Sequence, residues 1–276
     1  MFVEDEWNVI EDGFDADRHL IAESVFSIGN GHMGQRANFE EAYSGKTMQG
    51  NYIGGVFFPD TTRVGWWKNG YPDYFAKVIN APTWIGLHTS VNGKLLDLAK
   101  VKIKSFRRTL NMKEGTLSKS CMVEMPDGTR LHIESSRFVS MVSVEVGTIS
   151  YSITAENKAC SLSVLSFIES HVLNQDSNYD ECFWESISQK NGKGVSIAVD
   201  KTKSNPFGVP QFTVATAIST DVSVSATKKS YHKNLQVGET IDFELKKGET
   251  AVITKYAAQV STMNYSAEDL SKIVVE

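Results

Sequence analysis

From residue 85 onward, apolar and polar residues alternate with a period of two, which is the spacing of a half-buried β-strand. Turn signals separate these runs roughly every 8 to 12 residues. Clear examples are Asn92-Gly93, Pro126-Asp127-Gly128 and Lys246–Glu249. Because no helical pattern lies between the strands, the sequence predicts an all-β, antiparallel sandwich rather than an α/β fold.

Two predicted strands change phase. In Ser143–Ala155 the alternation shifts at Gly147-Thr148, where a β-bulge would fit. In the next strand, positions 162 and 164 share one phase and positions 165 and 167 the other. Four more strands are predicted toward the C-terminus, at Phe212–Ser219, Val222–Tyr231, Ile241–Leu245 and Ala251–Ala258.

The two ends of the chain depart from this pattern. We expect residues 1–20 to be acidic and irregular, with Trp7 and Phe14 as anchors, and Ser24–Ile28 to form a short strand. Near the other end, Ser266 is a suitable N-cap with acids in the turn after it, which predicts the start of a helix. We therefore divide the chain into a β domain, residues 1–265, and the start of a linker helix, residues 266–276.

The hexapeptide Gly29–Gly34 matches the dinucleotide fingerprint G-x-G-x-x-G. A true site needs these glycines to open an apolar helix within a strand–helix–strand unit. Here Ser44-Gly45 follows too soon for a crossover helix, and the Lys-Ser/Thr ending of a phosphate-binding loop is absent. A tight glycine turn is the better interpretation.

The stretch Phe39–Trp84 is rich in glycine, proline and aromatic residues. Flat aromatic faces beside fixed polar groups suit a sugar ring, whose hydroxyls need partners, so carbohydrate is the first ligand class to expect. Within this stretch, the loop Arg63–Pro72 supplies the candidate binding residues Arg63, Trp66, Trp67, Lys68, Asn69 and Tyr71. The alternative for the tryptophan pair is packing in a core or interface.

Residues 169–193 break the strand rhythm with a polar, acidic segment. Its spacing lacks the glycine and closing glutamate of an EF-hand, so we expect a solvated loop and no metal site. The three cysteines, Cys121, Cys160 and Cys182, are widely spaced without a Cys-x-x-Cys motif, which favours inert thiols in a reducing compartment.

Composition excludes several classes of protein. The 276 residues are 41% hydrophobic and 22% charged, as in ordinary globular domains, and the net charge of −5 gives no footprint for nucleic acid or an anionic membrane. We expect the basic cluster Lys100, Lys102, Lys104, Arg107 and Arg108 to form a solvated strand face. The acidic first residues do not resemble a signal peptide and no apolar stretch reaches the length of a membrane span, so a cytoplasmic protein is expected unless a leader precedes it.

Six motifs, taken in order, resemble the N-terminal domain of glycoside hydrolase family 65 over essentially the whole chain. They are Glu23–Arg36, Phe39-Glu40-Glu41, Arg63–Pro72, Asn80-Ala81-Pro82, Arg107–Leu117 and Ser136–Ser140. Within that family, Gly65–Pro72 is most similar to the maltose phosphorylases.

The resemblance implies a large antiparallel two-sheet super-sandwich of the galactose mutarotase-like type, joined by linker helices to an (α/α)6-barrel. It also implies that the barrel carries the general-acid glutamate and the phosphate site, and that the enzymes are commonly homodimers. No barrel pattern follows here, so we expect a non-catalytic domain of a longer enzyme. The implied ligands of that enzyme are a disaccharide and inorganic phosphate as co-substrate, with no cofactor, no metal and no catalytic residue in this chain.

The expected reaction of the longer enzyme is inverting phosphorolysis of an α-glucosyl disaccharide, in which an acid protonates the leaving oxygen while phosphate attacks the opposite face. The Arg63–Pro72 loop would help to enclose the sugar, and the domain would aid dimer assembly. Alternatives are a family 65 hydrolase acting on trehalose-type or kojibiose-type disaccharides, and a carbohydrate-binding or assembly module.

A third alternative, an autonomous hydrolase or mutarotase-like enzyme, would need its own acid and base, for which His32 with Glu40 or Glu41 is the candidate. Since neighbours in an extended segment point to opposite faces, Glu40 and Glu41 are not expected to act together.

Overall fold

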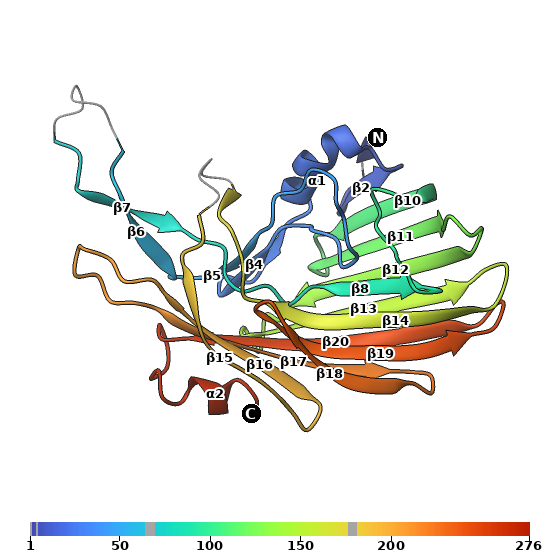
Figure 1. The fold of residues 1–276 in the computed structure, drawn as a ribbon. Coiled ribbons are helices and arrows are strands. Elements are labelled where there is room, and N and C mark those ends of the chain that lie inside the picture. Colours follow the sequence, from blue (N-terminus) through green and yellow to red (C-terminus); the bar gives the residue numbers. More distant parts are fainter. Residues whose placement is uncertain (1, 4, 64–69, 176–180) are drawn as a thin grey trace.

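Two large antiparallel sheets face each other across one apolar core in the computed structural model, and two smaller sheets extend from one end (Figure 1). The structure describes residues 2–3, 5–63, 70–175 and 181–276. The fold is the predicted all-β super-sandwich with a short helix near its C-terminal end.

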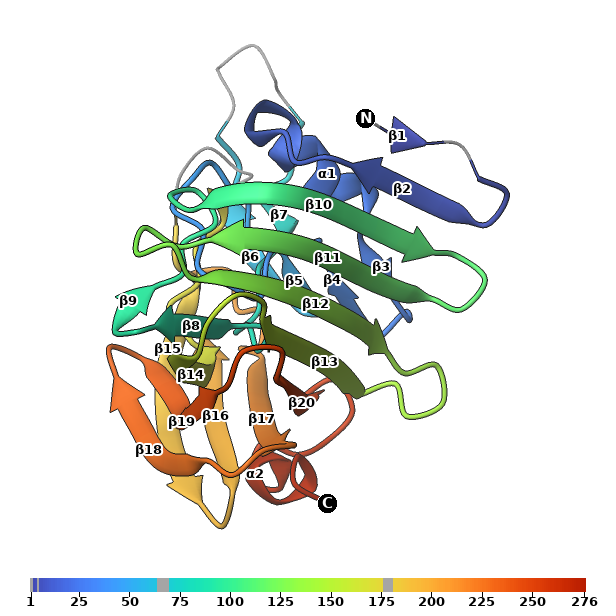
Figure 2. The same ribbon diagram turned by 90° about the vertical axis from the view of Figure 1, so that its right-hand side faces the viewer.

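The larger sheet has ten strands, and Figure 2 shows its β10–β13 part face on. In spatial order they are β1 (Phe2–Val3), β2 (Asn8–Asp12), β10 (Lys102–Asn111), β11 (Thr116–Glu124), β12 (Arg130–Val139), β13 (Val146–Ala155), β20 (Thr250–Ser261), β17 (Thr213–Val222), β16 (Val195–Thr202) and β15 (Trp184–Gly192).

The second sheet has five strands in the order β18 (Thr227–Lys233), β19 (Gln236–Leu245), β14 (Cys160–Glu169), β8 (Leu87–Val91) and β9 (Lys94–Leu95). A small sheet joins β3 (Ile28–Gly29), β4 (Met33–Gln35) and β5 (Asn51–Ile53). The remaining pair, β6 (Phe57–Thr61) and β7 (Tyr74–Val78), forms a hairpin that projects away from the sandwich (Figure 1).

Period-two burial builds the core between the two large sheets. Along β11, β12 and β13 nearly every second residue is buried, and these side chains meet those of β14 and β19. The predicted turns are confirmed, since Asn92 and Gly93 both have positive φ between β8 and β9, as a two-residue hairpin of this type requires. The expected C-terminal helix is present as α2 (Leu270–Ile273), but the predicted N-cap is wrong, because Asp269 and not Ser266 precedes the first helical residue.

Both predicted phase changes are wrong, because β13 and β14 pair with their neighbours without any shift of register. In β13, Gly147 occupies an inward position, and a Cβ there would lie 2.6 Å from the indole of Trp84. In β14, Phe167 is buried on the side away from the core, beside His88. A glycine facing inward and an apolar residue buried outside the core both imitate a phase change.

The first 30 residues are more regular than predicted. Strand β2 extends the large sheet, and a 3-10 turn, η1 (Ala16–Arg18), leads into helix α1 (His19–Val25), so Ser24-Val25 end a helix rather than begin a strand. Phe14 packs against the main core as predicted, whereas Trp7 is 48% exposed. The Gly29–Gly34 segment is the expected tight turn, between β3 and β4.

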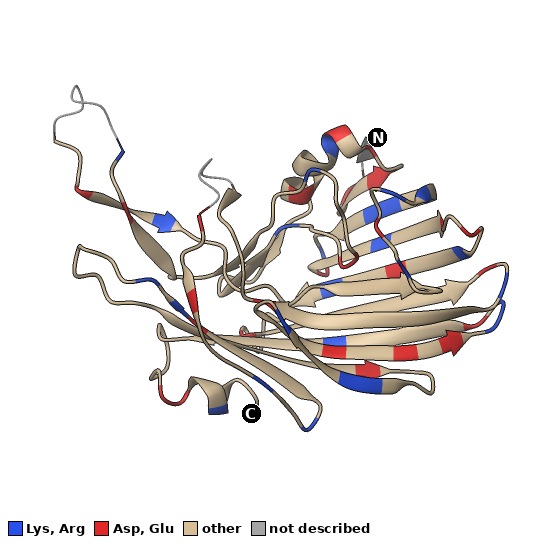
Figure 3. Ribbon diagram, viewed as in Figure 1, with Lys and Arg blue, Asp and Glu red and all other residues tan. Residues whose placement is uncertain are grey.

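The basic cluster divides between the two faces of β10. Lys102, Lys104 and Arg107 are exposed, and Figure 3 shows basic residues in blue along this strand. A register shift between Ile103 and Ser105 then turns Arg108 inward, where only 2% of it is exposed. The prediction of a solvated face is therefore wrong for Arg108.

Other sequence expectations concern cysteines and membranes. Cys121 and Cys160 are buried and Cys182 is half-buried, and all three are free thiols. Burial raises the pKa of Cys121 to about 12, which makes that thiol inert as expected. Among the described helices, none is long and apolar enough to cross a membrane.

Candidate functional site

The predicted sugar-binding loop lies at the tip of the β6–β7 hairpin. Of its six candidate residues, Trp66, Trp67, Lys68 and Asn69 lie outside the described residues. Arg63 is 2.7 Å from the Glu181 carboxylate and 3.3 Å from Asp60. The structure therefore ties one side of the loop to the distant segment that contains Glu181.

Tyr71 is 48% exposed on the other side of the same loop, with its ring edge-on to Phe75 at 6.0 Å between centroids. The base of the hairpin is anchored differently, by a small apolar cluster that includes Ile79 and Phe183. Not every aromatic residue of the Phe39–Trp84 stretch is available to a ligand, because Trp84 is fully buried under Gly147.

The candidate acid and base are not brought together as a pair. The His32 ring lies 3.2 Å from the Gln259 carbonyl on β20, whereas Glu40 and Glu41 both contact Lys119 on β11. The expectation that neighbouring carboxylates diverge is wrong here, because Glu40 and Glu41 lie in a bend rather than in an extended strand.

Glu40, Glu41, Lys119 and Arg137 form a buried ionic cluster between the loop and the large sheet. The Lys119 ammonium lies 2.7 Å from Glu40, and the Arg137 guanidinium lies 3.4 Å from the same carboxylate. Tyr151 donates a hydrogen bond of 3.1 Å to Glu41. Two cations thus face two carboxylates, and hydroxyl groups satisfy further oxygens, as buried charges require.

The electrostatics of this cluster fix its protonation state. Burial alone would raise the pKa of Glu40, but Lys119 and Arg137 outweigh that effect and hold it at about 2. Burial would likewise lower the pKa of Lys119, yet Glu40 and Glu41 raise it above its usual value. Both partners therefore stay charged near neutral pH, which suits a structural role and leaves no proton to exchange.

A second buried group joins helix α1 to the same loop. Glu23 is paired with His19 at 3.1 Å and accepts hydrogen bonds from Asn38, from Thr47 and from the Met48 amide. Arg108 contacts Glu11 at 3.2 Å and lies about 5 Å from the ring of Phe39. The loop from residue 36 to 50 is therefore held by buried polar contacts along most of its length.

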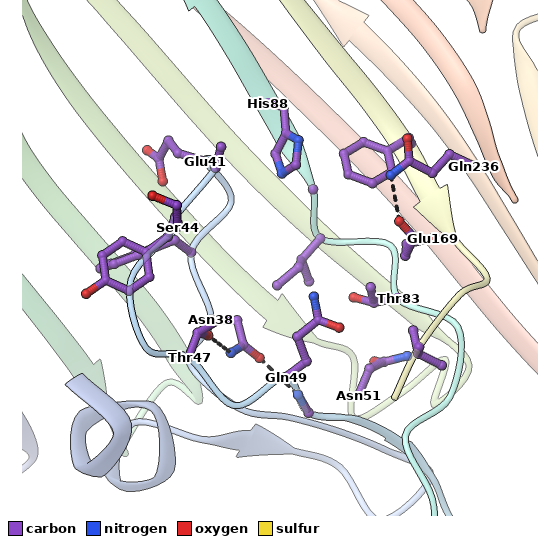
Figure 4. A pocket seen from close by; sticks show the side chains of 18 of the residues that line it. Asn38, Glu41, Ser44, Thr47, Gln49, Asn51, Thr83, His88, Glu169 and Gln236 are labelled. Carbon is purple, nitrogen blue, oxygen red and sulfur yellow. Dashed lines mark hydrogen bonds between the residues drawn. The ribbon is translucent and has the colours of Figure 1, made fainter. Parts of the chain in front are cut away.

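Beside this loop lies a cavity of about 420 Å³. Figure 4 shows its labelled side chains converging from the loop, from Thr83, and from the strands β5, β8, β14 and β19. The wall includes Asn38, Glu41, Ser44, Thr47, Gln49, Asn51, Asn80, Thr83, His88, Asp97, Glu169 and Gln236, with Phe39, Tyr43 and Phe167 as aromatic members.

Burial and one nearby cation control the ionisation of His88 in this wall. Desolvation lowers the pKa of His88 to about 4, with Lys255 adding to the effect. Burial raises the pKa of Glu169, although Gln236 donates a hydrogen bond of 2.6 Å to it. At neutral pH the imidazole is therefore uncharged.

Sequence reasoning missed most of this cavity. His88, Glu169 and Gln236 sit in three separate strands, and each looks like an ordinary outward position of a period-two pattern. The available signal was the Asn80–Thr83 segment, whose polar residues were recognised as part of the family resemblance but not as part of a wall. Among the described residues, no cluster of His, Cys, Asp and Glu side chains could hold a metal ion.

Several known proteins of similar sequence are named as disaccharide phosphorylases. The chain is 37% identical over 270 residues to the maltose phosphorylase of Bacillus subtilis (strain 168), covering 98% of this chain and 35% of the relative. It is 26% identical over 285 residues to the α,α-trehalose phosphorylase of Thermoanaerobacter brockii, covering 99% of this chain and 36% of the relative. The chain thus spans about a third of the length of these two relatives.

A solved structure shares the fold of this chain. A solved chain from the human microbiome, provisionally named a kojibiose phosphorylase, superposes with a TM-score of 0.86 at 20% sequence identity, over 99% of this chain and 35% of that one. At that identity the likeness concerns the fold alone. The sequence profile of the N-terminal domain of glycosyl hydrolase family 65 matches residues 9–275. The chain therefore belongs to glycosyl hydrolase family 65, as its N-terminal domain.

Proposed function

We propose that this chain is the non-catalytic N-terminal domain of an inverting disaccharide phosphorylase that acts on maltose. The observation that carries the proposal is the 37% identity to a maltose phosphorylase along 98% of the chain. In that reaction an acid on another domain protonates the leaving glycosidic oxygen, while phosphate attacks the anomeric carbon from the opposite face and becomes the sugar phosphate.

The state of the candidate acids supports a non-catalytic role. Glu40 and Glu41 are locked by Lys119, and the His32 ring bonds the backbone of β20. A general acid needs a proton near the operating pH, whereas the low pKa of Glu40 removes it. The proposal therefore places the acid and the phosphate site outside residues 1–276, with residues 266–276 beginning the link toward them.

For the β6–β7 hairpin we propose a supporting role at the entrance of the active site, in the same subunit or its dimer partner. Tyr71, Phe75 and Val78 expose 48%, 45% and 62% of their surfaces on this projecting hairpin. Exposed apolar groups of this kind usually mark a contact surface. Trp66, Trp67 and Tyr71 would shape the wall around the sugar, while Arg63, Lys68 and Asn69 would supply donors.

The test is phosphate consumption with maltose, trehalose or kojibiose, run in parallel on this chain and on the longer gene product. We expect turnover only in the longer protein, only with phosphate, and fastest with maltose. Turnover without phosphate would favour the hydrolase alternative. Activity of residues 1–276 alone would contradict the non-catalytic assignment.

The hairpin is tested by Trp67→Ala in the longer protein. The matched control is Trp7→Ala, because Trp7 is 48% exposed and directly precedes β2, in a sheet that does not include the hairpin. We expect Trp67→Ala to raise the Michaelis constant or lower the turnover number by about tenfold, the loss that one aromatic contact can cause. Unchanged constants would exclude the supporting role. Sedimentation of residues 1–276 tests dimer assembly separately.

A further inference from the structure

The cavity beside the 36–50 loop has the dimensions of a small-molecule site. Its volume of about 420 Å³ falls within the range of about 300 to 1,000 Å³ that such sites occupy. It lies on the outer side of the five-stranded sheet, because His88 alternates along β8 with the core residues Leu87 and Thr89. The cavity therefore lies outside the space between the two large sheets, although Phe39 and Ile85 in its wall also belong to the main core cluster.

One set of polar side chains in the wall forms hydrogen bonds to other protein groups. Asn38 donates to Glu23 and accepts from the Gly50 amide. Asn51 donates to the Pro82 carbonyl at 2.7 Å and accepts from Gln35. These groups are rigid and leave little hydrogen-bonding capacity for a ligand.

A second set faces the cavity without protein partners. Within the described part of the chain, the side-chain amide of Gln49, the Thr83 hydroxyl and the His88 ring make no hydrogen bond, and Figure 4 shows all three directed at the same space. The Asn80 Oδ1 atom is buried and likewise unpaired among the described residues, although its amide nitrogen donates to Gln49 and Leu173 carbonyls. Leaving a buried acceptor unpaired is costly, but solvent does not reach the Asn80 oxygen, so the groups open to a ligand are those of Gln49, Thr83 and His88.

The charge balance of the wall favours an uncharged ligand. Glu41 is neutralised by Lys119, and Asp97 is paired with Lys100, whose side chain is 72% exposed at the rim. His88 is neutral at pH 7, since burial and Lys255 lower its pKa to about 4. A phosphate group would meet carboxylates here and only one cation, which is already paired.

We propose that this cavity binds a neutral polyhydroxylated ring of about the size of one hexose. Gln49, Thr83 and His88 supply unpaired donors and acceptors around it, as ring hydroxyls require. The rings of Phe39, Tyr43 and Phe167 provide apolar surface for its C–H face. The site lies within the β domain and would bind sugar independently of the active site in the proposed function.

The direct test follows the His88 imidazole resonances of residues 1–276 by NMR during titration with D-glucose and, separately, with maltose. We expect a saturable shift at millimolar sugar. Absence of any shift in the His88 signals would overturn the proposal, and this measurement needs no variant. Inorganic phosphate is the charged probe, and saturable phosphate binding that displaces glucose would also overturn it.

Variants locate the site. His88→Leu and Thr83→Val each remove one hydrogen-bonding group, so each should weaken glucose binding by about two- to tenfold. The matched controls are His132→Leu on β12 and Thr148→Val on β13, both on the other sheet, and these should bind as the unmodified chain does. Equal binding by both pairs would place the sugar elsewhere and contradict the proposal.

The two proposals fail separately. If the longer protein consumes phosphate with maltose but the His88 signals do not respond to sugar, the proposed function stands and the cavity site is excluded. If the His88 signals respond but the longer protein shows no phosphorolysis, the cavity site stands and the proposed function is excluded.

Discussion

The two ends of the large sheet are stabilised by different means. At one end, Glu40 and Glu41 of the 36–50 loop form a buried ionic cluster with Lys119 of β11 and Arg137 of β12. At the other end, α2 covers β16, β17 and β20 with apolar residues such as Leu270 and Val274. A loop that must keep one irregular shape is fixed by directional ionic contacts, whereas a short helix needs only an apolar surface.

The largest effect is expected from breaking the ionic end. Lys119→Met removes the cation that Glu40 and Glu41 share and leaves only Arg137, which contacts Glu40, so the free energy of unfolding should fall by about 3 to 5 kcal/mol. Urea denaturation measures the loss. Lys104→Met is the control, because the Lys104–Glu124 pair is 37% and 31% exposed and should contribute less than about 1 kcal/mol. If both variants lost a similar free energy of unfolding, the contribution of Lys119 would not depend on its burial.

A somewhat smaller effect is expected at the apolar end. Leu270 is fully buried, so Leu270→Ala should cost about 2 to 4 kcal/mol by removing apolar contacts and leaving a cavity. Lys272→Ala, in the same helix but 77% exposed, should change stability by less than about 0.5 kcal/mol. If Leu270→Ala were silent in urea denaturation, α2 would not be part of the folded unit.

The smallest expected effect concerns two buried carboxyl groups, Asp200 and Glu40, whose contributions to stability change with pH in opposite directions. Asp200 is buried in β16, and burial raises its pKa to about 7, although Ser170 donates a hydrogen bond to it. Its favourable contribution is present at low pH and is lost as pH rises through 7, because the folded state binds the proton more tightly. Glu40, with a pKa of about 2, behaves oppositely and loses its contribution only as pH falls from its usual value toward 2.

Asp200→Asn should therefore make the chain more stable than the unmodified one at pH 8, by about 1 to 3 kcal/mol, and should flatten the decline between pH 5 and pH 8. Asp221→Asn, at an exposed position of β17, is the control and should leave that decline intact. Thermal unfolding across this pH range measures both. An unchanged pH profile in Asp200→Asn would refute the raised pKa.

Much of the sandwich could be predicted because its strands are amphipathic and its turns have clear signals, as at Asn92-Gly93. The N-terminal helix was missed because two of its buried residues, His19 and Glu23, are polar and satisfy each other. The burial of Arg108 was missed because it depends on the register shift between Ile103 and Ser105, for which the sequence has no signal. Its partner Glu11 is also almost 100 residues away in the chain. Period-two patterns reveal burial but not pairing.

The candidate sites divide in the same way. The hairpin loop could be proposed as a site because its aromatic residues are contiguous in the sequence, and that proposal stays a prediction. The cavity was not, because His88, Glu169 and Gln236 come together only when β8, β14 and β19 pair. A candidate site can therefore be named from one sequence where its residues are contiguous, but not where the register of several strands brings them together.

The close packing of Trp84 against Gly147 limits which residues positions 84 and 147 can hold. With the indole 2.6 Å from where a Cβ of residue 147 would stand, alanine at that position would force the ring out of its place. A smaller side chain at position 84 would free that space. Positions 84 and 147, far apart in the chain, are therefore expected to change together in related sequences, as a linked pair that tolerates double replacement better than either single one.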